Sequence, residues 1–233
     1  MHSFFCPSID GVSITLQDDE ARHAFGVLRL RVGEHICLLD GRGNTAEAEI
    51  GTADKHGCTA RVVSRTHIAS ERSARIHIAC ALTKQVDRFE WMLEKCTEIG
   101  VDRITPLLTK RTERAHLRMD RLQKIAISAM KQSKRAWLPQ VDGPLAIADL
   151  LKSELPAQRY FGWCEGTHAP LMKAYGGAAD VILLIGPEGD FTTEEAQLLS
   201  SSGFLPTSLG KARLRTETAA IMACVALNLA QVG

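Results

Sequence analysis

The sequence predicts an α/β protein of two domains, a small β domain followed by a larger domain of alternating strands and helices. At 233 residues the chain has room for two such domains. Short β-rich runs separated by turns occupy residues 33–64, and strand and helix patterns alternate from residue 75 onward. The pattern changes near Arg72, so we expect one domain over residues 1–72 and a second over residues 73–233.

The first domain is predicted from three β-rich runs, GEHICLL, TAEAEI and CTARVVS. Turn-forming residues separate these runs at 40–44 and at 54–57. This spacing is typical of a small antiparallel barrel or sheet.

The second domain begins with a strand, a helix and another strand. Apolar patterns predict strands over residues 76–82 and 103–108. Between them, apolar residues recur at helical spacing until Gly100, a residue suited to end a helix; they are Phe89, Met92, Leu93, Cys96 and Ile99. Such a βαβ unit implies a parallel sheet with a right-handed crossover.

The remaining elements follow the same alternation. Apolar residues between 122 and 130 predict a helix that ends before Pro139, and strands are expected at 160–164 and 181–185. The last helix, about residues 218–229, is apolar nearly all round. We therefore expect it to lie in a core or in a subunit interface.

Composition excludes several classes of protein. The 28 Lys and Arg residues balance 27 Asp and Glu residues, so net charge indicates no partner. The seven cysteines lie mostly in apolar runs and form no CxxC pair, which suits buried thiols in a reducing cytosol rather than a disulfide framework or a metal site. With neither a signal peptide nor a membrane-spanning run, we expect a cytoplasmic protein with no membrane partner.

Positive charge is concentrated in one stretch of the second domain. Residues 103–135 contain ten basic residues and two acidic ones. This excess favours a phosphate backbone as the partner, although a run of charge can also be a solvated helix face. Arg22, Arg29 and Arg31 of the first domain would extend the same surface.

Two glycine-containing turns are the candidate ligand sites. GPEGD at 186–190 follows a predicted strand, and Thr192 and Glu195 form a capping box for the next helix, which Gly203 closes. SLGKARLR at 208–215 precedes the last helix. Turns at the carboxyl ends of neighbouring parallel strands could enclose a small cofactor, and purely structural turns are the alternative.

Motifs of other chemistries are missing from the sequence. Neither GxGxxG nor GxxxxGK[ST] is present, so the turns match no common dinucleotide or phosphate loop. The serine-nucleophile motif GxSxG and the zinc motif HExxH are missing too. The eight histidines are scattered along the chain, so we do not expect a metal site.

Several segments resemble, in order, the RsmE family of ribosomal RNA methyltransferases in the SPOUT superfamily. LLIGPEGDFTTEEAQLLSSSGF and SLGKARLRTETAA resemble its two C-terminal signature motifs. KQVDRFEWMLEKCTEIGVDRITPL resembles its first helix region, RLQKIAISAMKQSKRAWLPQV its central basic helix, and HAFGVLRLRVGEHICLLDGRG its N-terminal PUA-like barrel. The similarity runs essentially from end to end.

The resemblance implies a SPOUT-type α/β domain with a trefoil knot, preceded by a small PUA-like β-barrel that binds RNA. It implies a homodimer through the C-terminal domain, S-adenosyl-L-methionine as cofactor, and methylation of N3 of uridine 1498 in 16S ribosomal RNA, either free or within the 30S subunit. A ribose 2′-O RNA methyltransferase of the same superfamily and a non-catalytic RNA-binding ribosome assembly factor remain alternatives.

Site residues are assigned from this resemblance, from the clusters of positive charge and from the position of the glycine turns. The expected cofactor-binding residues are Leu184, Gly186, Glu188, Gly189, Leu209, Gly210, Leu214 and Thr218. The expected RNA-binding residues are Arg22, Arg29, Arg31, Lys84, Arg88, Arg111, Arg114, Lys131 and Arg135. The catalytic candidates are Arg215, which would stabilise a uridine anion or form a structural salt bridge, and Glu217, which would contact the cofactor or brace the loops.

Two residues depart from the family's usual pattern. Asp190 stands where the family usually has a second glycine, and Lys131 stands where it usually has an acidic residue. Asp190 would reshape the rim of the pocket, and Lys131 would add charge to the RNA face.

Overall fold

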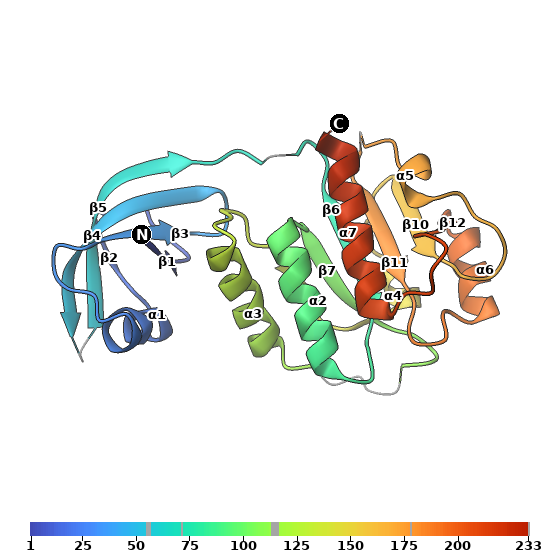
Figure 1. The fold of residues 1–233 in the computed structure, drawn as a ribbon, viewed down its shortest axis with the longest axis horizontal. Coiled ribbons are helices and arrows are strands. Elements are labelled where there is room, and N and C mark those ends of the chain that lie inside the picture. The colour runs from blue at the N-terminus through green and yellow to red at the C-terminus, as the bar shows by residue number, and fades with distance from the viewer. Residues whose placement is uncertain (55–56, 71, 113–116, 178, 233) are drawn as a thin grey trace. The chain divides into compact units, whose positions relative to one another are not determined.

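The computed structural model describes the chain except for residues 55–56, 71, 113–116, 178 and 233 (Figure 1). Its contacts divide the chain into two compact units. The first contains Met1–Glu71 and Ile127–Leu138, and the second contains Arg72–Ala126 and Pro139–Gly233. The candidate ligand turns both lie in the second unit.

The second unit is built on a parallel sheet. Its strands are β6 (Ile76–Ala81), β7 (Arg103–Leu108), β8 (Gln140–Val141), β9 (Leu145–Ala146), β10 (Gln158–Gly162), β11 (Val181–Ile185) and β12 (Leu205–Thr207). They lie in the order β12-β10-β11-β6-β7-β8, with β9 also paired to β7, and all these pairings are parallel. The predicted parallel sheet is therefore confirmed.

Helices cover both faces of this sheet (Figure 1). On one face α7 (Thr216–Val232) contacts β6, β11, α2 (Val86–Ile99) and α5 (Leu171–Ala174). On the other face α4 (Ile147–Leu150) and α6 (Thr193–Ser201) contribute to one apolar cluster with β7, β10 and β11. Every residue of β11 is buried, as expected for a central parallel strand.

Local sequence signals determine where two of these helices begin or end. Gly100 ends α2 with a φ of 112°, a left-handed conformation that favours glycine. At the start of α6, the Thr192 side chain accepts from Glu195 N at 3.2 Å, and the Glu195 carboxylate accepts from Thr192 N at 2.8 Å. The predicted capping box is confirmed.

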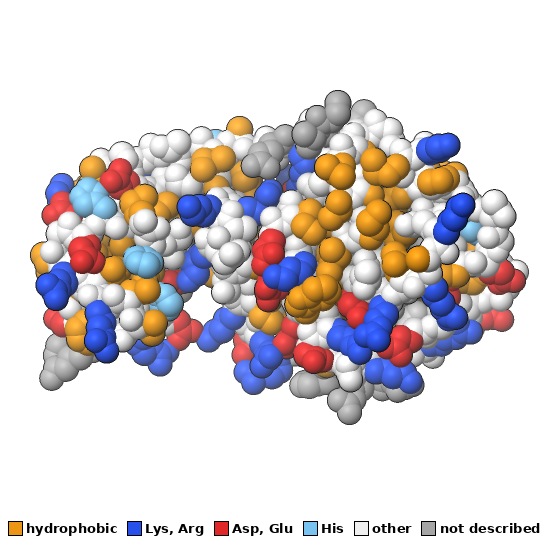
Figure 2. Space-filling model, viewed as in Figure 1, with side chains coloured by type: hydrophobic (Ala, Val, Ile, Leu, Met, Phe, Trp, Pro, Cys, Tyr) orange, Lys and Arg blue, Asp and Glu red, His pale blue; other side chains and the backbone are white. Residues whose placement is uncertain are grey.

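Helix α7 buries only one of its apolar faces. Ala220, Ala223 and Leu227 are buried against the sheet and α2, whereas Met222 and Leu229 are 44% and 61% exposed. Figure 2 shows apolar side chains gathered over the α2 and α7 side of this unit. The chain itself therefore buries one face of this helix, as we expected, and leaves the other face exposed. Among the described helices, none is long and apolar enough to cross a membrane.

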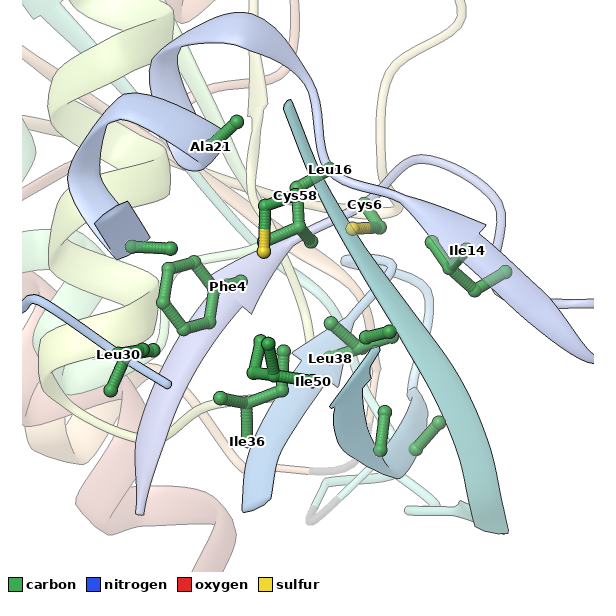
Figure 3. Packing of buried hydrophobic residues seen from close by; sticks show 14 of the residues in the cluster. Phe4, Cys6, Ile14, Leu16, Ala21, Leu30, Ile36, Leu38, Ile50 and Cys58 are labelled. Atoms are coloured by element: carbon green, nitrogen blue, oxygen red, sulfur yellow. The ribbon is translucent and has the colours of Figure 1, made fainter. Parts of the chain in front are cut away.

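The first unit contains a five-stranded sheet in the order β1-β3-β4-β5-β2. Its elements are β1 (His2–Phe5), β2 (Ser13–Thr15), α1 (Asp18–Arg22), the π-helix η1 (His23–Val27), β3 (His35–Leu39), β4 (Asn44–Asp54) and β5 (Gly57–His67). The three predicted strands are present as β3, β4 and β5. The pairing is not purely antiparallel, because β1 runs parallel to β3. Phe4, Ile36, Leu38 and Ile50 are among the residues that form its core (Figure 3).

A segment far along the chain completes the first unit. Helix α3 (Met119–Gln132) spans the division between the units, and the residues after it bond to the turn between β3 and β4. Gly43 N donates to Ala136 O at 3.0 Å, and Leu138 N donates to Gly41 O at 2.9 Å. Gly43 has a φ of 90°, and a Cβ there would lie 2.5 Å from the Trp137 ring, so only glycine fits.

A buried histidine makes the second unit sensitive to acid. Burial, and next the Arg103 guanidinium, lower the pKa of His77 to about 4, while Asp142 acts in the opposite direction. Because an unfolded chain takes up this proton near pH 6.5, stability is complete above that pH and is lost as the pH falls toward 4. The gap between the two pKa values corresponds to roughly 3 kcal/mol.

We therefore expect the free energy of unfolding to fall between pH 7 and about pH 4.5. In His77→Asn, the fall in the free energy of unfolding over this interval should be smaller than in the parent protein by about 2 to 3 kcal/mol. Urea unfolding at both pH values measures the difference. An equal loss in both proteins would show that other groups cause the acid sensitivity.

Candidate functional site

The candidate site lies at the carboxyl edge of the parallel sheet, where open α/β sheets place their ligands. The two glycine turns follow β11 and β12, but these strands are not neighbours as we expected from the sequence. Strand β10 lies between them. The loop that follows β10 therefore joins the same edge, and it contributes residues that the sequence patterns did not indicate.

The turn after β11 is tightly constrained. Asp190 N donates to Pro187 O at 2.9 Å, which closes the turn, and Gly189 and Asp190 have φ values of 90° and 70°. A Cβ on Gly186 would lie 3.0 Å from both the Asp190 carboxylate and Phe191 N. Glycine is needed at position 186 because the turn folds back over it.

Hydrogen bonds link this turn to the other two loops. Thr216 Oγ1 donates to Gly186 O at 3.1 Å, and Cys164 N donates to the Asp190 carboxylate at 2.9 Å. Between the loops after β10 and β12, Ser208 N donates to Ala169 O at 3.1 Å. These contacts connect residues 164–171, 186–191 and 208–216 in a closed circuit, which we call the loop ring.

Part of the loop ring has backbone groups that could bind a ligand. In the part of the chain that the structure describes, the N–H groups of residues 211–214 have no hydrogen-bond partner. Gly210 has a φ of 130°, with open space where a Cβ would stand. Unpaired backbone donors and acceptors next to a glycine can hold the base and sugar of a nucleoside.

The two catalytic candidates differ in their surroundings. Arg215 is exposed, and within the described residues its guanidinium has no ion-pair or hydrogen-bond partner, so the structural salt bridge is not found there. Glu217 is buried, and its carboxylate accepts from Arg88 Nη1 at 3.2 Å. That ion pair joins the helices α7 and α2.

Three predicted cofactor residues also fall in distinct environments. Leu184 is fully buried in the strand β11, with its side chain in the core cluster of that unit. Glu188 is exposed on the turn, and Thr218 is exposed in the first turn of α7. Leu184 can therefore contribute to a cofactor site only by holding the strand in place, whereas Glu188 and Thr218 offer polar groups at the surface.

An open pocket of about 350 Å³ adjoins the turn after β11. Its lining residues are Leu82, Lys84, Lys110, Arg111, Thr112, Pro187 and Glu188. Three cationic side chains and one carboxylate give the lining a net positive charge. Arg111 Nη1 donates to the carbonyl oxygens of Gly189, Asp190 at 3.0 Å and Phe191 at 3.4 Å. Arg111 thus binds the turn, a contact not indicated by its predicted RNA-binding role.

Much of the basic stretch is neutralised by acidic residues from elsewhere in the chain. Among the described residues, at least five of its basic residues form ion pairs, namely Arg103–Asp142, Lys110–Glu194, Arg118–Asp120, Arg121–Glu90 and Lys131–Glu20. Four of these five carboxylates lie outside residues 103–135. The local excess of positive charge in the sequence therefore overstates the charge available to a partner.

The remaining predicted RNA-binding residues that the structure describes all belong to the first unit. Arg22 pairs with Asp19, Arg29 is exposed with a φ of 54°, and Arg31 is exposed. Lys131 is largely buried in its ion pair with Glu20, at 2.6 Å. Arg135 is partly buried, and Arg114 lies outside the described residues. Within the described residues, no group of three or more His, Cys, Asp or Glu side chains could hold a metal ion.

Comparison with known families defines the class of this protein. A model of the RNA methyltransferase domain matches residues 70–228, and a model of the RNA methyltransferase PUA domain matches residues 16–63. The chain therefore consists of an RNA methyltransferase domain preceded by a PUA domain.

Individual relatives narrow this class. The ribosomal RNA small subunit methyltransferase E of Synechocystis sp. is 32% identical over 223 residues, which cover 93% of this chain and 73% of that protein. The chain belongs to the ribosomal RNA small subunit methyltransferase E family.

Solved structures share the whole fold. A "probable rRNA-methyltransferase" from Porphyromonas gingivalis is 40% identical, with a TM-score of 0.89 over 96% of this chain and 95% of that one. A ribosomal RNA small subunit methyltransferase E from Neisseria gonorrhoeae, bound to S-adenosyl methionine, is 30% identical, with a TM-score of 0.90 over 98% of this chain and 97% of that one.

Proposed function

We propose that this protein is an S-adenosylmethionine-dependent methyltransferase that acts on N3 of uridine 1498 in 16S ribosomal RNA. The observation that carries the proposal is the loop ring. Among the described residues, it presents backbone N–H groups without a hydrogen-bond partner beside an exposed arginine without an ion-pair partner. Membership of the ribosomal RNA small subunit methyltransferase E family supports both the substrate and the cofactor. We include a cytoplasmic location in the proposal, because the proposed ribosomal RNA substrate would be found there.

The residues of the loop ring fit an adenosyl group. The backbone of Gly186, Leu209, Gly210 and Leu214 would hold the adenine and ribose, and Glu188 and Thr218 offer polar contacts at the rim. When bound, S-adenosylmethionine supplies a methyl group on a positively charged sulfur. The main task of the protein is then alignment, because orientation alone can contribute roughly 7 to 11 kcal/mol in favourable cases.

Arg215 would act on the uridine. N3 carries a weakly acidic proton, and its loss leaves negative charge on the flanking carbonyl oxygens. A guanidinium placed beside those oxygens stabilises the charge as it develops. Arg215 can take this position because it stands next to Thr216, which binds the turn after β11, and because no protein carboxylate holds it among the described residues.

The RNA would be held by phosphate contacts. N3 lies on the pairing edge of the base, so the uridine must be presented unpaired. The pocket cations Lys84, Lys110 and Arg111 would bind phosphates next to the target, and Arg29 and Arg31 would do so on the PUA domain. Contacts of this kind position an RNA without reading its sequence.

We extend the proposal to the finer architecture of both units, a trefoil knot in the second and a closed barrel in the first. The knot is supported by the path of the C-terminal segment, which leaves the edge strand β12 and returns as α7 to the middle strands β6 and β11. The barrel is supported by the five-stranded sheet and its central apolar core.

We also propose a homodimer formed through the second unit. Trp91 of α2 and Met222 and Leu229 of α7 are 44% to 61% exposed, and they would be covered by a second copy. Light scattering of the purified protein should therefore give twice the mass of one chain. A mass of one chain at micromolar concentration would contradict this part of the proposal.

The reaction is tested on ribosomal RNA. RNA from a strain that lacks the gene should lose one base-methylated uridine, which mass spectrometry of nuclease fragments detects. Incubation of this RNA, both free and as 30S subunits, with the protein and S-adenosylmethionine should restore the methyl group. Loss of a ribose methyl group would favour a 2′-O methyltransferase, and the absence of saturable S-adenosylmethionine binding in calorimetry would favour a non-catalytic assembly factor.

A further inference from the structure

Asp190 makes hydrogen bonds to three different segments at one side of the loop ring. Besides the bond from its own N–H to Pro187 O, its carbonyl accepts from Arg111 Nη1 at 3.0 Å. Its carboxylate accepts from Phe191 N at 2.8 Å through one oxygen and from Cys164 N at 2.9 Å through the other. One residue thus binds its own turn, the segment after β7 and the loop after β10.

The backbone of Asp190 is in an unfavourable conformation. Its φ of 70° lies in the left-handed region, which aspartate tolerates better than most residues but which still costs energy relative to glycine. Such a conformation persists where surrounding contacts hold it in place. The two bonds accepted by the carboxylate are contacts that glycine could not make.

The bond from Cys164 to Asp190 has no substitute in the ring. Within the described residues, it is the hydrogen bond that joins the loop after β10 to the turn after β11. The other links of that loop run to the β12 side, through Ala169 and Ser208. Without the Asp190 carboxylate the circuit would open at this point, while Thr216 would still bind Gly186.

We propose that Asp190 is a positioning residue that locks the loop after β10 to the turn after β11, and that it thereby sets the affinity for S-adenosylmethionine rather than the rate of methyl transfer. The second half of this inference rests on the proposed function. An open ring would be competent to bind for only a fraction of the time, and the apparent Kd rises by the inverse of that fraction. A complex that has formed would be closed again, so kcat would be preserved.

The affinity of three variants tests the proposal. In calorimetry, Asp190→Ala should weaken S-adenosylmethionine binding by about tenfold, and Asp190→Asn, which keeps one acceptor oxygen, by about threefold. Asp190→Gly removes the backbone strain but also the link, so it should bind more weakly than the parent protein. At saturating cofactor all three should keep kcat within about twofold.

A second readout follows the lock without any cofactor. Cys164 is the exposed cysteine among seven thiols, so its rate of modification by N-ethylmaleimide, assigned by mass spectrometry, reports the mobility of its loop. Burial and the neighbouring Asp190 carboxylate both raise the pKa of the Cys164 thiol, so the reference is Asp190→Asn, which lacks that charge but keeps an acceptor oxygen. Asp190→Ala and Asp190→Gly should accelerate modification of Cys164 severalfold over Asp190→Asn. Cys164→Ser, which keeps the backbone N–H, should remove the signal.

A matched control is available at the opposite end of the same strand. Asp180, just before β11, accepts from Arg75 N at 2.7 Å, a bond of the same kind far from the carboxyl edge. Asp180→Ala should leave both the cofactor affinity and the labelling of Cys164 unchanged.

Three results would overturn the inference. They are Cys164 labelling no faster in Asp190→Ala and Asp190→Gly than in Asp190→Asn, cofactor binding by Asp190→Gly as tight as in the parent protein, and a fall in kcat with no change in Kd. If the parent protein itself bound no S-adenosylmethionine, the proposed function would fail, whereas faster labelling in Asp190→Ala and Asp190→Gly than in Asp190→Asn would still establish the lock.

Discussion

Replacing Arg215 with alanine is expected to lower kcat for RNA methylation by about 100-fold or more, the usual effect of removing a group that stabilises developing charge. The Kd for S-adenosylmethionine should stay within about threefold, because the side chain is exposed and has no partner among the described residues. Arg215→Lys keeps the charge without the planar guanidinium, and it should recover part of the rate. Single-turnover methylation and calorimetry measure the two quantities separately.

Arg75→Ala is the matched control for this experiment. Arg75 is also exposed, but it lies just before β6, at the amino end of a strand whose carboxyl end borders the site. Its removal should change neither kcat nor Kd. If Arg215→Ala weakened cofactor binding as much as it slowed transfer, Arg215 would be a residue that builds the pocket rather than one that acts on the uridine.

The second large effect is expected from Gly186→Ala. The added methyl group would lie 3.0 Å from Phe191 N and from the Asp190 carboxylate, and 3.2 Å from the Phe191 ring. Because one of these neighbours is backbone, the whole turn must move. We expect cofactor binding to weaken at least tenfold, or about 1.4 kcal/mol, and the free energy of unfolding to fall by about 1 to 3 kcal/mol.

Calorimetry and urea unfolding test this prediction, with Gly143→Ala as the control. Gly143 is exposed, and no heavy atom lies within 4 Å of a Cβ built there. Its substitution should leave both quantities unchanged. Unaltered S-adenosylmethionine binding by Gly186→Ala would mean that the turn after β11 does not form the cofactor site.

Sequence patterns predicted what depends on neighbouring residues. The strands β7 and β11, the glycine end of α2 and the capping box of α6 follow from apolar spacing and from capping chemistry within a few residues. The glycine turns were found in the same way, since a strand that runs into glycine and then into a capped helix is a local signal. These features also place most of the candidate site.

The missing parts depend on contacts between distant segments. The place of β10 between β11 and β12, and with it the role of Cys164, follows from strand order, which local spacing does not encode. The partners of Arg121 and Lys131 are Glu90 and Glu20, which lie 31 and 111 residues away. A count of charges along a short stretch cannot include such partners, so it exaggerated the positive surface.

The loop ring likewise depends on segments that are far apart in the sequence. Thr216, which closes the circuit onto Gly186, belongs to the last helix, while Cys164 and Asp190 come earlier in the chain. A nascent polypeptide that had emerged only as far as β12 would already contain the sheet but would have no closed receptor for a nucleoside. The receptor would thus close only after the segment that follows β12 had also been made.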